Sequence, residues 1–201
     1  MRPGEGEVLH FSEDPTIVEF VPHVAATARV GGAYVWAVDT LRAPAYWFPR
    51  QCPRVLAWAR DGATGSDIAS ILGPSGATRV HAVEYGWLER MRSVRLYAYR
   101  LPATSFRPFA EPEPARRGGP WEPAAHVTTV PVRPLGAPER VGDLFALHEE
   151  AGIELRVLPA LWTFWGAVTA STLGFSGIRL RNASPLLAPA ELHIGHRWSP
   201  P

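Results

Sequence analysis

The chain has 201 residues, a formal net charge of +1, and 46% hydrophobic and 10% aromatic residues. This composition provides a core for one folded domain, excludes a disordered chain, and gives no global basic field for nucleic acid. All 20 basic residues are arginine, which excludes a Schiff-base lysine, a pyridoxal-phosphate anchor and a P-loop lysine.

The N-terminal third predicts three strands and a short helix. Residues 7–11 alternate polar and apolar side chains, as a half-buried strand does. Residues 34–38 and 55–59 are continuous apolar runs typical of buried strands. Between these two runs, Asp39 is the expected N-cap of a short helix over residues 41–47.

The middle of the chain predicts two short helical segments and two strands. A helix opens at Ser66 and stops at Gly73, and residues 86–92 form a helical turn. Residues 80–83 are a second apolar strand. Residues 94–101 alternate arginine with apolar and aromatic side chains, which is the pattern of a half-exposed strand.

The last third predicts two helices and two strands. The clearest helix spans residues 138–151, with a proline in its first turn and Gly152 as its C-terminal stop. A strand over residues 153–157 follows directly, and the apolar run 161–173 is expected to be a buried helix. Residues 178–181 alternate as a closing strand.

Two segments are expected to lie outside the core. Residues 107–125, RPFAEPEPARRGGPWEPAA, are too rich in proline and glycine for a helix or a ladder strand, and they predict a surface excursion. Residues 183–201 are also proline-rich and predict a peripheral tail. The remaining elements show no regular strand–helix alternation. Residues 1–201 therefore predict a single α+β domain of mixed or antiparallel sheets with a few short helices.

The single cysteine and the N-terminus bear on the compartment. Cys52 alone forms no internal disulfide and no all-cysteine zinc site. The opening MRPGEGEVLHFSEDP lacks the apolar stretch of a secretory signal, and no run of about 18 apolar residues occurs, so no membrane span is predicted. We therefore expect a cytoplasmic protein.

Four runs of the chain resemble a bacterial family of unknown function: HFSEDPTIVEFVPH, VWAVDTLRAPAYWFPRQCPRV, ELRVLPALW and FSGIRLRNA. A more distant resemblance is to the ADP-ribosyltransferase-like superfamily, which implies a split-sheet fold. Its members open with a strand motif that residues 8–12 (VLHFS) resemble. They continue with a strand and a helix that residues 35–39 (VWAVD) and 43–46 (APAY) resemble. A glutamate on a late strand completes their His-Tyr-Glu set, and Glu154 is the nearest match here.

The superfamily resemblance implies NAD as a substrate, with ADP-ribose transferred to an unknown acceptor. His10 would hydrogen-bond the nicotinamide ribose and Tyr46 would stack on the nicotinamide ring. Glu154 would stabilise the positive charge that develops as nicotinamide leaves. Ser12, in the opening motif, and Arg50 and Arg54, with their planar donor forks, would contact the cofactor. The pattern departs from the family's at Gly152, where an acidic residue or glutamine usually stands.

Other interpretations stay open for each of these residues. His10 can be a half-buried strand histidine, Tyr46 part of an aromatic core, and Glu154 an outward residue of a strand. The arginines can hold backbone carbonyls. A non-catalytic ligand-binding or protein-interaction domain with a degenerate cleft is the alternative function. A Cys52 nucleophile with His10 or His81 as its base is a third reading. His193 and His196 lack a third metal ligand, so no metal site is expected.

Overall fold

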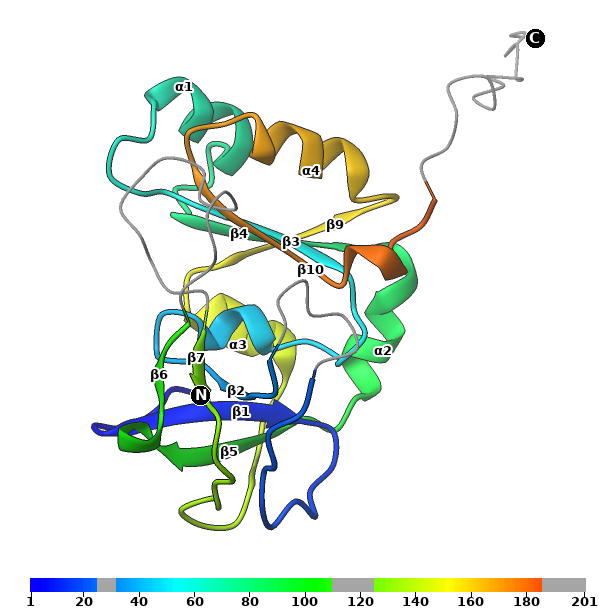
Figure 1. The fold of residues 1–201 in the computed structure, drawn as a ribbon. Coiled ribbons are helices and arrows are strands. Elements are labelled where there is room, and N and C mark those ends of the chain that lie inside the picture. The colour runs from blue at the N-terminus through cyan, green and yellow to red at the C-terminus, as the bar shows by residue number, and fades with distance from the viewer. Residues whose placement is uncertain (25–31, 110–124, 186–201) are drawn as a thin grey trace, which may run out of the picture.

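The computed structural model describes residues 1–24, 32–109 and 125–185, which form an α+β domain as predicted. Figure 1 shows an upper layer, in which one sheet is covered by helices, and a lower layer of shorter sheets. Helix α3 (Leu144–Glu150) lies between the two layers, and α2 (Leu88–Ser93) runs along one side. For function, the side chains that lie between these two layers are the ones of interest.

The upper sheet has four strands in the order β10 (Gly174–Ile178), β3 (Arg54–Trp58), β4 (Arg79–Glu84) and β9 (Glu154–Leu158). Neighbouring strands are antiparallel except β4 and β9, which are parallel. Strands β3 and β4 are almost entirely buried, because both faces of the sheet are covered.

The two faces of the upper sheet pack against different elements. The outer face packs against η2 (Ile68–Leu72), the turn that continues α1 (Gly65–Asp67), and against α4 (Trp162–Thr169). Val80 and Ala82 lie in this outer cluster. The inner face carries Val83, which packs with Phe48, Cys52 and Met91.

The lower layer consists of two three-stranded sheets. One has the order β1 (Glu7–Ser12), β5 (Tyr97–Pro102), β8 (Glu139–Arg140), and the other β2 (Val35–Ala37), β7 (His126–Thr128), β6 (Arg107–Pro108). Leu9 and Val38 exchange backbone hydrogen bonds of 2.8 Å, which bring β2 beside β1. Short 3₁₀ turns complete the fold: η1 (Ala43–Tyr46), η3 (Tyr85–Trp87), η4 (Ala103–Ser105) and η5 (Leu180–Asn182).

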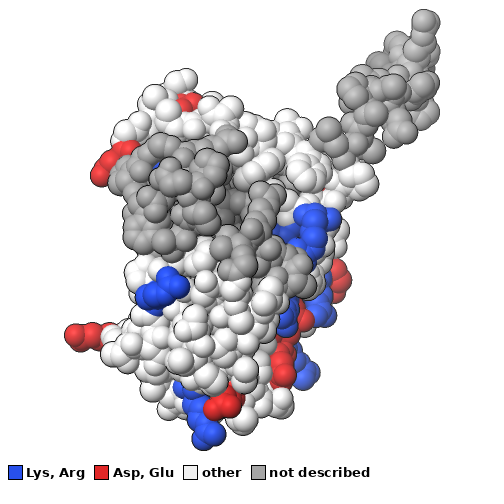
Figure 2. Space-filling model, viewed as in Figure 1, with Lys and Arg blue, Asp and Glu red and all other residues white. Residues whose placement is uncertain are grey.

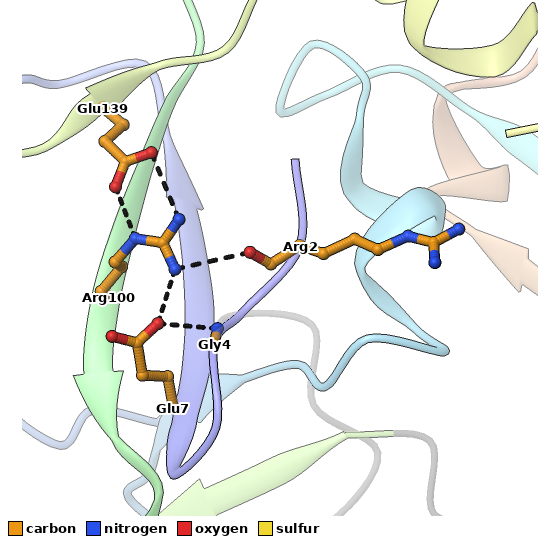
Figure 3. A network of polar contacts seen from close by, with 5 residues as sticks. All are labelled: Arg2, Gly4, Glu7, Arg100 and Glu139. Carbon is orange, nitrogen blue, oxygen red and sulfur yellow. Dashed lines mark hydrogen bonds and ion pairs between the residues drawn. The ribbon is translucent and has the colours of Figure 1, made fainter. Parts of the chain in front are cut away.

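Arg100 connects the strands of the first lower sheet (Figure 3). Its guanidinium on β5 donates to Glu7 on β1 and to Glu139 on β8, and Glu7 also accepts from the Gly4 backbone N–H. The Gly4 hydrogen bond and the Arg100 guanidinium lower the pKa of Glu7. This arginine therefore serves the fold, with both of its neighbouring carboxylates ionised.

The helix expected over residues 138–151 begins later than predicted. Asp143 is its N-cap, with its carboxylate accepting from the backbone N–H of Phe145 (2.7 Å) and Ala146 (3.1 Å). Glu139–Arg140 is instead strand β8, because Glu139 pairs with Arg100 across the sheet. The predicted stop is confirmed, since Gly152 has the positive φ of 65° that favours glycine after a helix.

The closing strand expected over residues 178–181 is wrong in position. The strand is β10, Gly174–Ile178, and the chain turns into η5 directly after it. The glycines of β10 interrupt the alternation of side chains by which a strand is predicted. Gly174 is needed there, because a Cβ would lie 2.3 Å from the Trp58 indole nitrogen. The apolar helix expected over residues 161–173 is α4, which ends at Thr169.

The two segments expected outside the core are corrected at their edges. Residues 107–108 form β6, and buried Phe109 donates its backbone N–H to Ala125 at 2.9 Å. The rest of the excursion, residues 110–124, and the tail beyond 185 lie outside the described residues. The start of the tail is held in place, because Ser184 donates both its N–H and its hydroxyl to the buried Glu84.

No helix in the described parts of the chain is long and apolar enough to cross a membrane.

Candidate functional site

His10 lies on β1 and faces the lower core. Its Nδ1 is 2.7 Å from the carbonyl oxygen of Trp36 on β2, and its ring centroid is 4.6 Å from that of Phe20. Burial lowers the pKa of His10, and the positive charges of Arg50 and His23 lower it further, whereas the Trp36 carbonyl acts in the opposite direction. The ring is therefore neutral at pH 7. With Nδ1–H donated to Trp36, Nε2 is left as an acceptor.

Tyr46 lies at the end of η1. It packs on the face of β1 that carries Leu9, whereas His10 points to the opposite face. The Tyr46 ring packs against the cluster of Leu9, Val38 and Ala43. The ring is half-buried, and its hydroxyl makes no hydrogen bond to a described residue. Tyr46 therefore presents a fixed aromatic ring with a polar end that a ligand can use.

Ser12 and Arg54 serve the local fold. The Ser12 hydroxyl accepts from the Asp14 backbone N–H at 3.1 Å, which shapes the turn after β1. Arg54 is only 3% exposed and donates to the carbonyls of Ala45 (2.7 Å) and Cys52 (2.9 Å). Burial lowers the pKa of Arg54 to about 10, so the group stays charged at neutral pH. Both side chains are used by the protein itself, as the structural interpretation of Arg54 anticipated.

Glu154 does not lie with His10 and Tyr46. It pairs in register with Val80, whose side chain belongs to the outer cluster of the upper sheet. Its carboxylate accepts from Ser75 (2.7 Å) and from Arg156, which also donates to the Ile71 carbonyl of η2. The expected convergence of Glu154 with His10 and Tyr46 is therefore not what the structure shows.

The ionisation of Glu154 fits a structural role. Burial raises the pKa of this carboxyl, but the hydrogen bond from Ser75 and the Arg156 guanidinium outweigh that effect, and the pKa ends below its ordinary value. Glu154 is thus an ionised partner of Arg156, and together they attach the edge strand β9 to η2.

Arg50 is exposed and lies between several elements. Its backbone N–H donates to Glu13 at 2.9 Å, while its guanidinium makes no hydrogen bond or ion pair within the described residues. The positive charge of Arg50 contributes to lowering the pKa of both His10 and Arg179. Of the residues predicted to bind the cofactor, Arg50 is the one that remains available.

Arg179 follows the last residue of β10 and has an unusual backbone. Its φ is 57°, the one positive value at a non-glycine residue in the described ranges. This left-handed conformation costs an ordinary residue about 1 kcal/mol or more and often marks a functional position. Ile178, just before it, pairs with Arg54, whose guanidinium carbon lies 5.5 Å from the centre of the Tyr46 ring.

Arg50, Arg179 and Arg181 form what we call the arginine cluster. Burial lowers the pKa of Arg179, and the neighbouring charges of Arg181 and Arg50 lower it further. Asn182 fixes the two chain segments together by donating to the Gln51 carbonyl at 2.8 Å and to its side-chain oxygen at 3.2 Å. On the face shown in Figure 2, positive and negative side chains lie side by side along the flank where α2 lies.

The ion pairs of the described residues set Arg50 and Arg181 apart from several other arginines. Several other arginines in the described residues pair with carboxylates, among them Arg90–Glu13, Arg100–Glu7, Arg133–Glu19 and Arg156–Glu154. Arg50 and Arg181 have no carboxylate partner within the described ranges. Positive charges held close together repel one another, and an anionic ligand would relieve this repulsion.

A cavity of about 400 Å³ adjoins the arginine cluster, and we call it the Trp87 cavity. It is lined by Glu13, Pro49, Arg50, Gln51, Trp87 and Arg90. A second cavity of about 390 Å³, between α2 and the N-terminus of α3, contains none of the predicted site residues. The Trp87 cavity is therefore the one connected, through Arg50, to the predicted site.

Cys52 is not a nucleophile in this structure. It is fully buried, and burial raises the pKa of its thiol to about 12 even though the Arg54 charge opposes the shift. His81 does not serve as its base, because its Nδ1 is 3.0 Å from Nε2 of His148. Within the described ranges, no group of three metal-ligating side chains could hold a metal ion. His193 and His196 lie outside those ranges.

A family model described as a family of unknown function (DUF6886) matches residues 9–183. The chain belongs to this family. The matched range begins one residue before His10 and ends just after Asn182, so it contains Tyr46 and the whole arginine cluster. Neither the search of curated proteins nor the search of solved structures finds a match to this chain.

Sequence reasoning missed five residues of this region: Glu13, Trp87, Arg90, Arg179 and Arg181. The one available signal was the pair of arginines in IRLRN, which alternation assigned to a strand. Nothing in the local sequence marks the left-handed backbone of Arg179, which arises where β10 ends against Tyr46 and the Gln51 segment.

Proposed function

We propose that the protein binds NAD at the arginine cluster and transfers its ADP-ribose to an acceptor. The observation that carries this proposal is the gathering of Arg50, Arg179 and Arg181 beside the half-exposed ring of Tyr46. Guanidinium groups match phosphate oxygens in geometry and charge, and an aromatic face suits the nicotinamide ring. The proposal continues the sequence-based expectation with a different set of phosphate contacts.

The roles follow from the state of each side chain. The arginine cluster neutralises the pyrophosphate, and Tyr46 stacks on the nicotinamide ring. His10 has no role in this scheme, because its side chain lies on the face of β1 opposite to the one that packs against Tyr46. As the glycosidic bond breaks, nicotinamide leaves with the electron pair, and positive charge develops on the ribose until the acceptor attacks. Glu154 has no role in this scheme, because it lies on the outer face of the upper sheet.

A second candidate is a domain that binds the nucleotide without catalysis. It is favoured by the placement of Glu154, since the carboxylate expected to stabilise the developing charge is held by Arg156 and Ser75. The two candidates share the binding site and differ in whether nicotinamide is released.

Thermal unfolding with and without NAD, together with a nicotinamide-release assay, tests both candidates. A ligand that binds only the folded state at 100 times its Kd stabilises it by about 2.7 kcal/mol, which is a readily measured shift in Tm. Tyr46→Ala and Arg50→Ala should lose most of this shift, while exposed Arg133→Ala should keep it. Glu154→Gln should bind NAD and release nicotinamide as the wild type does.

The outcomes separate the candidates. Nicotinamide release by the wild type, lost in Tyr46→Ala, supports the transferase. A shift in Tm with no release supports the non-catalytic domain. The absence of any shift with NAD overturns both.

A further inference from the structure

The Trp87 cavity has one aromatic wall in a fixed position. Trp87 ends η3, directly before α2, and packs against the cluster of Phe48, Val83 and Met91. It is half-buried and also lines the cavity, so it offers ring surface there. Pro49 adds a second rigid, apolar surface. A planar ring that stacks on Trp87 would meet a wall that is already ordered.

Two positive groups border this aromatic wall. The Arg50 guanidinium has no partner among the described residues and lines the cavity. Arg90 donates to Glu13 at 2.5 Å through one of its nitrogen atoms, which leaves further N–H donors for a ligand. Both positions suit the oxygen atoms of a phosphate group attached to the planar ring.

The polar groups of the cavity present both an acceptor and a donor. Each carboxylate oxygen of Glu13 accepts one hydrogen bond, from the Arg50 N–H or from Arg90, and retains further lone pairs. The side-chain oxygen of Gln51 accepts from Asn182, which directs the Gln51 amide nitrogen away as a donor. An exocyclic amino group beside a ring nitrogen complements this pair, as found on adenine.

We propose that the Trp87 cavity binds an adenine nucleotide 5′-phosphate, with the base stacked on Trp87 and the phosphate on Arg50. Because Arg50 also belongs to the arginine cluster, the nucleotide is the adenylate half of the same dinucleotide. This last step rests on the proposed function, whereas the mononucleotide site does not. Hypoxanthine has an oxygen in place of the amino group, and this oxygen would face the Glu13 carboxylate.

Calorimetric titration of the full chain with AMP, IMP and ribose 5-phosphate tests the site. AMP should bind at least about tenfold more tightly than ribose 5-phosphate, because base stacking on an aromatic side chain is worth roughly that factor or more. IMP should bind more weakly than AMP. Trp87→Leu should weaken AMP by a similar factor and leave ribose 5-phosphate unchanged. Arg50→Ala should weaken both ligands.

Matched variants separate stacking from folding. Trp87→Phe keeps an aromatic face and should retain most of the affinity for AMP. Tyr85→Leu changes a 60% exposed aromatic residue on the same turn that does not line the cavity, and should bind AMP as the wild type does. Equal AMP binding by Trp87→Leu and the wild type, or no AMP binding by the wild type, overturns the proposal.

Competition with NAD identifies the source of the nucleotide. Displacement of AMP by NAD, with both weakened by Trp87→Leu, supports the adenylate half of the dinucleotide. Simultaneous binding of AMP and NAD overturns that assignment. If AMP binds and NAD does not, the proposed function fails and the mononucleotide site stands. If NAD binds through Tyr46 and AMP does not bind, the proposed function stands and the Trp87 cavity proposal fails.

Discussion

Acidification is expected to destabilise this protein through the buried pair His81–His148. His81 lies on β4 of the upper sheet and His148 on α3, and both are almost inaccessible to solvent. His148 Nδ1 is 2.6 Å from the Leu144 carbonyl, so Nδ1–H donates there and Nε2 accepts from His81 Nδ1–H. Both rings are therefore neutral, and the remaining His81 Nε2 has no hydrogen-bond partner among the described residues.

The direction of the effect follows from the pKa values. Burial lowers the pKa of both histidines, and the charges of Arg79 and Arg54 lower that of His81 further. Below the ordinary histidine pKa of 6.5, the unfolded chain binds more protons than the folded chain. The free energy of unfolding is therefore at its full value above that pH and falls as the pH decreases through it.

The magnitude is set by how far the pH falls below 6.5. At pH 5.5, a histidine that stays fully neutral in the folded chain lowers the free energy of unfolding by about 1.4 kcal/mol, so the pair lowers it by at most about 3 kcal/mol. This is a large part of the free energy of unfolding of a typical domain, which is about 5–15 kcal/mol. Urea unfolding at pH 7.5 and 5.5 measures the loss directly.

The control replaces both rings together. His81→Leu/His148→Leu removes the donor and the acceptor at once, which avoids leaving one of them buried and unpaired. The double variant should lose at least about 1 kcal/mol and at most about 3 kcal/mol less than the wild type between the two pH values. The other titrating groups, including His10, act equally on both proteins. If the double variant shows the same loss as the wild type, the reasoning about this pair is refuted.

Three further predictions concern stability, each measured by urea unfolding. Arg179→Gly should be more stable than Arg179→Ala by about 1 kcal/mol, because both lose the side chain and only glycine relieves the φ of 57°. Equal stabilities would show that this backbone is unstrained. Arg54→Met should cost about 2–5 kcal/mol, since two buried carbonyls lose their donor, whereas Arg133→Met should cost little. Asp143→Ala should cost about 1 kcal/mol by removing the cap of α3, and a neutral effect would contradict the capping role.

The parts of the fold that follow from side-chain periodicity could be predicted. Strand β1 was expected over residues 7–11 and spans Glu7–Ser12. Its alternating side chains, with His10 and Leu9 on opposite faces, made it recognisable. Strand β10 could not be found this way. Its glycines stand where Trp58 and Trp165 approach the backbone, and such contacts depend on distant parts of the chain.

The candidate site was predictable to a lesser extent. The late strand that carries Glu154 was expected, but the face on which this side chain lies depends on the parallel pairing of β9 with β4. Arg156 adds to this by donating to carbonyls of η2, 84 or more residues away in sequence. Arg54 shows a related limit, because its charge and position suited a phosphate equally well until the carbonyls it holds were known.

The arginine cluster has a consequence for the timing of folding during synthesis. Arg50 lies in the first third of the chain and Arg181 near its end, and β10, which delivers Arg179, pairs with β3 across more than 110 residues. A ribosome that has released only the N-terminal strands has therefore produced Tyr46 and the Trp87 wall without the late arginines. A ligand that needs Arg179 and Arg181 can stabilise only the nearly complete chain, so such a ligand would act on the last docking step, when β10 closes the upper sheet.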